Sequence, residues 1–297
     1  MTRYIEIFEQ HFFFPIFDFW GTPILLALFI IFFIAETYRR LRRNKISRWE
    51  RIKSNIILAA TAMPVLRLAL IPALVFVARW AEQEGYGLLH WVQIPYWVGF
   101  AIGFLLLDYG NYLWHVLTHR WNFLWRFHNI HHIDLDLDLT TGIRFHFGEV
   151  LLSVFFRGLL ILVIGAPALL VLIYEIVFEG ATLFHHSNWK LPYKFEKAMS
   201  WIFVTPRMHG VHHSIVKRET DSNYSIIFSC WDRFHRSIKL NIPQDEINIG
   251  VPSYRNPEEQ TVWKMLIMPF DKSRPWELPD GKVPERTSGG EEDRLVP

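Results

Sequence analysis

Histidine is the residue type in this sequence whose number and spacing are best suited to chemistry. The chain has 14 histidines in 297 residues, and most of them lie between His115 and His213. Eight of them form three short motifs, WHVLTHR, FHNIHH and MHGVHH, which contain His115, His119, His128, His131, His132, His209, His212 and His213. Spacings of three and four residues place imidazoles on one side of a helix, where they can share a metal ion. Burying this many unpaired imidazoles would cost free energy, so we interpret them as metal ligands rather than as structural polar residues.

Two further histidines are expected to join the three motifs. His146 lies in the segment RFHFGE, where Arg144 and Glu149 could act as its partners. The segment FHHSN contains the neighbouring residues His185 and His186. Adjacent residues on a helix point about 100° apart, so we expect only one of these two to bind. At this point the residues leave the choice between them open.

Ten candidate ligands are enough for two metal ions with about five imidazoles each. A structural zinc site takes four ligands, so this number exceeds one such site. Imidazole suits iron, copper, zinc and nickel, and two redox-active metals could activate O2 for attack on an inert C–H bond. Three isolated histidines are interpreted as structural or surface residues: His11, His90 and His235.

Polar residues near the histidines are candidates for a second layer that orients the ligands. Asp108 and Asn111 lie seven and four residues before His115, on the same stripe of the predicted helix. A carboxylate one or two turns from a ligand could accept its second ring N–H. The complete set of second-layer candidates is Asp108, Glu149, Asn188 and Asp221. For each carboxylate the alternative is an ordinary surface or helix-end charge.

The composition indicates a membrane protein and excludes several other classes. Hydrophobic residues make up 51% of the chain and charged residues only 20%. The formal net charge of +2 argues against a nucleic-acid partner. A single cysteine, Cys230, excludes an intrachain disulfide framework, a cysteine-rich zinc site and a cysteine-ligated iron–sulfur cluster. Because no GxSxG, P-loop or GxGxxG motif occurs, a redox reaction would need an external electron donor.

Long apolar runs predict the membrane spans. The first is 20–38, the second is 55–78, which contains Pro64 and Pro72, and the third is 94–115. The run 151–184 is interrupted by Gly165-Ala166-Pro167, which predicts a helical hairpin that enters the membrane and returns to the same side. Two tilted spans would give the same sidedness.

The distribution of charge predicts which side of the membrane carries the histidines. Eight basic residues follow the first span between positions 39 and 53, so the positive-inside rule places this loop in the cytoplasm. Every histidine motif then falls on the cytoplasmic face. We predict an all-α, polytopic membrane protein with about four membrane helices or hairpins and a cytoplasmic helical cap. The expected parts are an interfacial segment (1–19), a transmembrane bundle with the first histidine motifs (20–187), a cap with the last motif (188–273) and a flexible tail (274–297).

Taken together, these motifs resemble the fatty acid hydroxylase/sterol desaturase superfamily, and most closely its sterol desaturase and alkylglycerol monooxygenase side. The resemblance runs from about Asp108 to Phe234, with HxxxH, HxxHH and HxxHH boxes on the three histidine motifs. RFHFGE resembles the family's RFHPxE, with Phe147 in the proline position, and FHHSNWKLP matches FxHxN followed by Leu-Pro. This second match favours His186 over His185. DSNYSIIFSCWDRF resembles the region after the third box, but His235-Arg236-Ser237 replaces the family's Gly-Thr.

The resemblance implies a non-haem di-iron oxygenase that hydroxylates or desaturates a sterol, a fatty acid or an ether lipid. Two iron ions held by the ten histidines would be the cofactor, and zinc could replace them through misloading. The co-substrate would be O2, and a cytochrome b5, a ferredoxin or a tetrahydropterin would supply electrons. The expected location is the bacterial inner membrane or the endoplasmic reticulum. The alternative from another class is a membrane metal carrier or sensor, which would use the same histidines without redox chemistry; carriers usually hold their ligands near mid-membrane.

Overall fold

The computed structural model describes residues 16–286 of the chain, and within this range it contains helices and isolated bridges but no strand. The prediction of an all-α fold is therefore confirmed. Most of the predicted interfacial segment 1–19 and the last part of the predicted tail lie outside the described residues. The boundaries drawn between bundle, cap and tail stay predictions.

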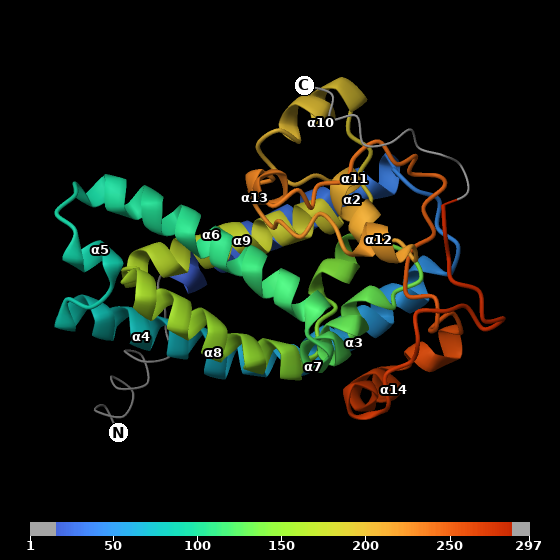
Figure 1. Ribbon diagram of the computed structural model, residues 1–297, viewed down its shortest axis with the longest axis horizontal. Coiled ribbons are helices and arrows are strands. Elements are labelled where there is room, and N and C mark those ends of the chain that lie inside the picture. Colours follow the sequence, from blue (N-terminus) through green and yellow to red (C-terminus); the bar gives the residue numbers. More distant parts are fainter. Residues whose placement is uncertain (1–15, 287–297) are drawn as a thin grey trace.

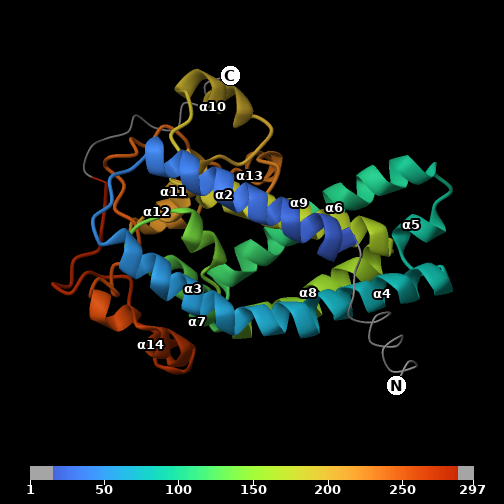
Figure 2. The ribbon, with the colours of Figure 1, turned by 180° about the vertical axis from the view of Figure 1, so that it is seen from behind.

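Long helices that lie side by side form an elongated bundle (Figure 1). Turning the molecule shows the same bundle from behind, with α2 and α3 in front (Figure 2). The long elements are α2 (Thr22–Tyr38), α3 (Arg48–Val65), α4 (Ile71–Glu84), α6 (Tyr96–Arg120), α8 (Phe147–Ile164) and α9 (Ala168–His186). Three shorter elements belong to the bundle: η1 (Ile16–Gly21), η2 (Leu66–Leu70) and α5 (Leu88–Trp91).

Four helical segments of the described chain are long and apolar enough to cross a membrane: 17–38, 48–91, 147–164 and 168–186. The number of about four membrane helices is therefore confirmed. Helix α6, which the sequence predicted as the third span, is not among these four, although it has 25 residues. Its inner face buries Asp108, Asn111 and His115, and these polar residues reduce its apolar character.

Prolines and glycines end the helices where the sequence suggested interruptions. Between α3 and α4 the chain forms the π-helical turn η2, with Pro64 just before it and Pro72 at the start of α4. Gly165 ends α8 in a left-handed conformation with φ 70°, and Pro167 precedes α9. Proline lacks the N–H that a helix interior needs, and glycine adopts positive φ without steric cost.

The turn between α8 and α9 reaches the end of the bundle that lies opposite the histidines. The backbones of Gly165 and Gly87 are in close contact there, so the turn lies beside the connection between α4 and α6. Leu89 and Ala166 belong to the same apolar cluster at this end. The two helices therefore extend along the bundle as far as α4 and α6 do, which favours two full spans over a shallow hairpin.

Replacing Gly87 by alanine is expected to destabilise the protein by at least about 2 kcal/mol. Gly87 has φ 107°, and an added Cβ would lie 2.3 Å from the Gly165 nitrogen. Backbone strain of this kind costs about 1–3 kcal/mol, and the steric overlap adds to it. Gly85→Ala is the matched control, because Gly85 also has positive φ but no atom of the described residues lies within 4 Å of its added Cβ. Thermal unfolding in detergent would measure both; equal losses would contradict the role of the Gly87–Gly165 contact.

Shorter helices form a cap over one end of the bundle (Figure 1). We use the name cap for α7 (Asn122–His132), η3 (Leu139–Ile143), α10 (Tyr193–Met199), α11 (Pro206–His212), α12 (Lys217–Thr220), α13 (Cys230–Phe234), η4 (Pro257–Gln260), α14 (Val262–Ile267) and η5 (Met268–Phe270). The described part of the predicted tail is attached to this cap. Trp276 Nε1 donates to the Ile215 carbonyl at 2.8 Å, and Arg286 pairs with Glu219 at 2.6 Å.

A buried ion-pair network joins the cap to the start of α3. Arg51 Nε and Nη2 donate to the two oxygens of Asp134 at 2.7 and 2.8 Å, and Arg51 Nη1 donates to Asp138 at 2.7 Å. Arg51 is only 4% exposed. Asp134 and Asp138 flank the loop that connects α7 to η3, so this network holds the loop after the second histidine motif in place.

Candidate metal centre

Nine histidines face one another in two buried groups at the junction of bundle and cap. Eight of them come from the three motifs, and the ninth comes from the end of α9. The first group contains five residues: His115 and His119 of α6, His128 and His132 of α7, and His212 of α11. The second contains His131 of α7, His186 of α9, His209 of α11 and His213. Within each group the potential ligand atoms lie within 4.8 Å of one another. Four separate segments of the chain thus supply imidazoles to one junction.

In the first group, hydrogen bonds to Nδ1 determine which ring nitrogen faces the other histidines. Nδ1 of His115 lies 2.7 Å from the Tyr224 carbonyl, and Nδ1 of His212 lies 2.7 Å from the Ser222 carbonyl. Nδ1 of His128 lies 2.8 Å from Glu149 Oε1. An acceptor at Nδ1 requires the proton there and leaves the lone pair on Nε2. Nε2 of His128 and of His212 is buried without a partner among the described residues, as is expected of atoms that bind a cation.

In the second group, three pairs of Nε2 atoms lie close together, and hydrogen bonds alone cannot account for all three contacts. Nε2 of His186 lies 3.0 Å from Nε2 of His131 and 2.8 Å from Nε2 of His209, and the latter lies 3.1 Å from Nε2 of His213. Nδ1 of His186 donates to the Thr182 carbonyl at 2.8 Å, so its Nε2 carries a single lone pair. Two ligands at right angles with metal–nitrogen bonds of about 2.1 Å would lie about 3.0 Å apart. The donor set and its spacing therefore fit a metal ion.

Burial favours the protonation state that binds metals. Desolvation lowers the pKa of His131, His132, His209, His212 and His213 well below the ordinary value, and neighbouring histidines lower it further. A neutral imidazole is the form that ligates a metal. These five rings are therefore ready to bind at neutral pH without first losing a proton.

His146 and His185 are the two candidate histidines that belong to neither group. His146 precedes α8 and caps it: its Nδ1 accepts from the Gly148 N–H at 2.9 Å, and its Nε2 lies 3.1 Å from the Leu266 carbonyl. The structure does not bring it to the other nine, and its role as a ligand stays a prediction. His185 binds the Ile226 carbonyl through Nδ1, and of the adjacent pair it is His186 that belongs to a group.

The four second-layer candidates lie in different places. Glu149 binds His128 directly, and Asp221 Oδ1 lies 3.8 Å from Nδ1 of His119. Among residues 16–286, Asp108 has no hydrogen bond to a histidine and instead accepts from Trp231 Nε1 at 2.7 Å and from the Phe228 N–H at 3.2 Å. Asn188 binds the backbone of Arg42 through both side-chain atoms, at 2.8 and 2.9 Å. It therefore connects the 39–47 loop to the end of α9.

Backbone carbonyls at Ser222 and Tyr224 are functional groups that sequence reasoning missed. The loop that carries them is held by Asp232, whose carboxylate accepts from the Tyr224 and Ser225 N–H groups at 2.9 Å each. The only available signal was the segment DSNYSIIFSCWDRF, to which no individual role could be assigned. The types of the side chains in a segment do not indicate which backbone carbonyl will accept a hydrogen bond from an imidazole on another helix.

Replacing Glu149 by glutamine is expected to lower the iron affinity of the first group about tenfold. Outer partners of a ligating histidine contribute about 10–100-fold to metal affinity. The amide oxygen can still accept from His128, so the loss should fall at the lower end of this range. The measurement is the iron retained per chain at increasing chelator concentration. Glu50→Gln is the control, because Glu50 is exposed at the start of α3; equal retention in both variants would contradict the role of Glu149.

Comparison with known proteins finds similarity over the segment that carries this site. Residues 100–237, which contain both histidine groups, match the family model of fatty acid hydroxylase. The chain is 32% identical over 133 residues to ornithine lipid hydroxylase OlsE of Rhizobium tropici, which covers 45% of this chain and 39% of the relative. It is 30% identical over 139 residues to alkylglycerol monooxygenase of Xenopus tropicalis, covering 44% and 28%. It is 26% identical over 186 residues to cholesterol 25-hydroxylase of Mus musculus, covering 58% and 59%. Each match spans less than two thirds of the relative's own length, and no solved structure gives a significant match.

Proposed function

We propose that the chain, whose residues 100–237 match the family model of fatty acid hydroxylase, is an integral-membrane di-iron oxygenase that hydroxylates a C–H bond of a lipid. Desaturation of the same lipid is the second outcome that such a centre allows. The lipid classes to test are ether lipids, sterols and amino-acid-containing lipids. The three relatives, which are hydroxylases or monooxygenases, support this choice.

The pair of buried histidine groups is the observation that carries the proposal. Five and four imidazoles converge in two adjacent places, and rings 131 and 132, which are adjacent in sequence, belong to different groups. Two metal ions in neighbouring sites are a recurring arrangement in metalloenzymes. When bound, two iron ions would supply the redox chemistry that activates O2 for attack on a C–H bond.

The residues of the chain have the task of holding and isolating these ions. Glu149 and the carbonyls of Ser222 and Tyr224 hold three imidazoles in the tautomer that exposes Nε2. All nine histidines are buried, which excludes bulk water from the place of reaction. Hydroxylation consumes one O2, two electrons and two protons for each hydroxyl group formed, and it releases one water. The electrons have to come from a separate donor, for which a cytochrome b5, a ferredoxin and a tetrahydropterin are the candidates.

The proposed orientation places the histidine groups on the cytoplasmic face of a membrane. The loop at 39–47 lies at the cap end, since the Leu41 N–H donates to the Asn188 carbonyl at 2.8 Å. Its basic residues support a cytoplasmic position by the positive-inside rule. The lipid tail would then lie among the spans, with its reacting carbon near the cap.

The position of the histidines also supports an oxygenase over a metal carrier. The two groups lie where α6 and α9 end, whereas carriers usually hold their ligands near mid-membrane. Their rings are buried and fixed by hydrogen bonds through Nδ1 at several positions. Such fixed, enclosed ligands suit a resident cofactor better than an ion that must be released.

Metal content and the origin of the product oxygen test the proposal together. Protein purified in mild detergent without metal-affinity resin is expected to contain close to two iron ions per chain. After reduction, incubation with lipid under isotopically labelled O2 should give a hydroxylated lipid that carries the label. If zinc is found, the same measurement is repeated after exchange for iron. A folded, monodisperse sample that binds no metal, or a product labelled from water, would contradict the proposal.

A further inference from the structure

A cavity lies in the cap, separate from the histidine groups. It has a volume of about 340 Å³ and lies between α10, α11, α13 and the segment 238–244. Met208 and Val211 of α11 line it, while His209 and His212 of the same helix belong to the metal groups. On α11 the pair Met208 and Val211 points about 100° away, on average, from the pair His209 and His212. One short helix therefore separates this cavity from the proposed di-iron centre.

The cavity is strongly basic. Four cationic residues line it, namely Lys197, Arg207, Arg233 and Lys239. Glu196 is the one acidic residue among the lining side chains, and it is occupied by Arg207, whose Nε lies 2.7 Å from Glu196 Oε2. Three cations thus remain without a carboxylate in the cavity, so a bound anion would be favoured.

These three cations also lack partners that would satisfy their donors. Among residues 16–286, no hydrogen bond or ion pair holds the ammonium group of Lys197 or of Lys239. Arg233 donates to the Ser200 carbonyl at 3.1 Å through Nη2, but its Nε is buried without a partner. An oxyanion with several acceptor oxygens is the chemical group that fits unpaired donors of this kind.

The surface beside the cavity is apolar rather than polar. Trp201 lies at the cavity under the Arg233 guanidinium, whose carbon is 4.2 Å from the ring centroid. The two residues after it, Ile202 and Phe203, are 56% and 43% exposed. A basic cavity next to exposed apolar side chains fits an amphiphile with an anionic headgroup better than it fits a free anion.

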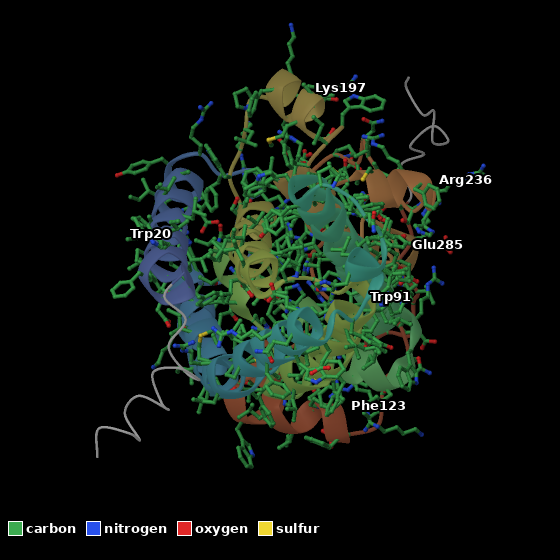
Figure 3. All side chains as sticks on the ribbon, turned by 90° about the vertical axis from the view of Figure 1, so that its left-hand side faces the viewer. Trp20, Trp91, Phe123, Lys197, Arg236 and Glu285 are labelled. Carbon is green, nitrogen blue, oxygen red and sulfur yellow. The ribbon has the colours of Figure 1, made fainter. Side chains whose placement is uncertain are left out.

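The position of α10 places this surface over the lipid that would surround the bundle. Helix α10 stands off to one side of the long helices (Figure 1). Viewed along the bundle from the α5 end, Lys197 of α10 lies beyond the outline of the membrane helices (Figure 3). A bilayer around the candidate spans would therefore face the underside of this part of the cap.

We propose that this cavity binds the phosphate headgroup of an anionic phospholipid, whose acyl chains lie along the exposed surface formed by Trp201, Ile202 and Phe203. Free inorganic phosphate shares the headgroup chemistry, but it would make no use of the apolar surface. The bound lipid would contact α11, the helix that also carries His209 and His212. The proposal does not depend on iron or on oxidation.

Native mass spectrometry of the full-length protein from mixed micelles can test this binding. With phosphatidylglycerol and phosphatidylcholine of equal chain length present together, one phosphatidylglycerol is expected to remain on each chain in preference. Lys197→Gln and Lys239→Gln should each weaken this retention about fivefold, the usual contribution of one basic residue at an anionic lipid surface. Neither ammonium group holds another part of the described chain, so both variants should fold. Lys194→Gln is the matched control, because Lys194 is exposed on α10 but does not line the cavity.

Three results would overturn the proposal. Equal retention of the two lipids would remove the need for an anionic headgroup. An equal loss in Lys194→Gln would indicate diffuse attraction to surface charge rather than a site. Displacement of the lipid by a modest excess of inorganic phosphate would identify free phosphate as the ligand. Iron content measured on the same samples keeps the result separate from the fate of the oxygenase proposal.

Discussion

Replacing His131 by alanine is expected to reduce product formation by more than about a hundredfold and to lower the iron content per chain. His131 lies 3.0 Å from Nε2 of His186, and its ring centroid is 4.7 Å from that of His213. It is the one residue of α7 in the second group, whereas His128 and His132 belong to the first. Loss of an outer hydrogen-bond partner alone costs about 10–100-fold in affinity or activity, and the loss of a ligand should cost more. The measurements are iron per chain and the rate of lipid hydroxylation.

Two other histidine variants make this result specific. His235→Ala is the control, because His235 is exposed and stacks on Tyr109 outside both groups; it should retain iron and activity. His146→Ala distinguishes a site of ten ligands from one of nine, since His146 lies outside both groups and caps α8. Retention of iron in this variant is expected from the structure. A His131→Ala protein that keeps two irons and full activity would contradict the proposed centre.

The membrane helices and the histidine motifs could be predicted because their signals are local. A long apolar run indicates a span without knowledge of its neighbours, and spacings of three or four residues place side chains on one helical face. The choice of His186 over His185 needed the match to FxHxN, because two adjacent residues at a helix end give no periodicity. The structure agrees in placing His186 in a group, while the roles of all these residues as ligands await measurement.

The rest of the site depends on contacts between distant segments, which local patterns do not contain. His146 has the expected residue type and sequence context, but the start of α8 turns its ring toward the Gly148 N–H and the Leu266 carbonyl. Asp108 was expected to orient a histidine one or two turns away, yet it binds Trp231 and the Phe228 N–H. In both cases a partner from elsewhere in the chain determines where the side chain points.

The basic run after the first span shows the same limit. It was interpreted as a topology signal, for which each arginine is equivalent and exposed. In the structure Arg42 and Arg51 are buried, at 7% and 4% exposure, and each contacts residues more than 80 positions away. Arg42 Nη1 binds Gln244 at 2.6 Å, and Arg51 binds Asp134 and Asp138. These two arginines therefore also connect the cap to the bundle. Counting the charges in the run does not reveal this role.

Replacing Arg51 by methionine is expected to destabilise the protein by about 3–5 kcal/mol, the usual cost of removing one partner from a buried ion pair. Two carboxylates, Asp134 and Asp138, would lose their cation while staying buried. Thermal unfolding of the iron-loaded protein in detergent would measure the effect. Arg274→Met is the matched control, because it breaks the exposed pair with Glu259, where the expected loss is at most about 1 kcal/mol. Adding Asp134→Asn to the Arg51 variant should restore part of the lost stability, because it removes one uncompensated charge. If the Arg51→Met protein were as stable as Arg274→Met, this network would not hold the cap.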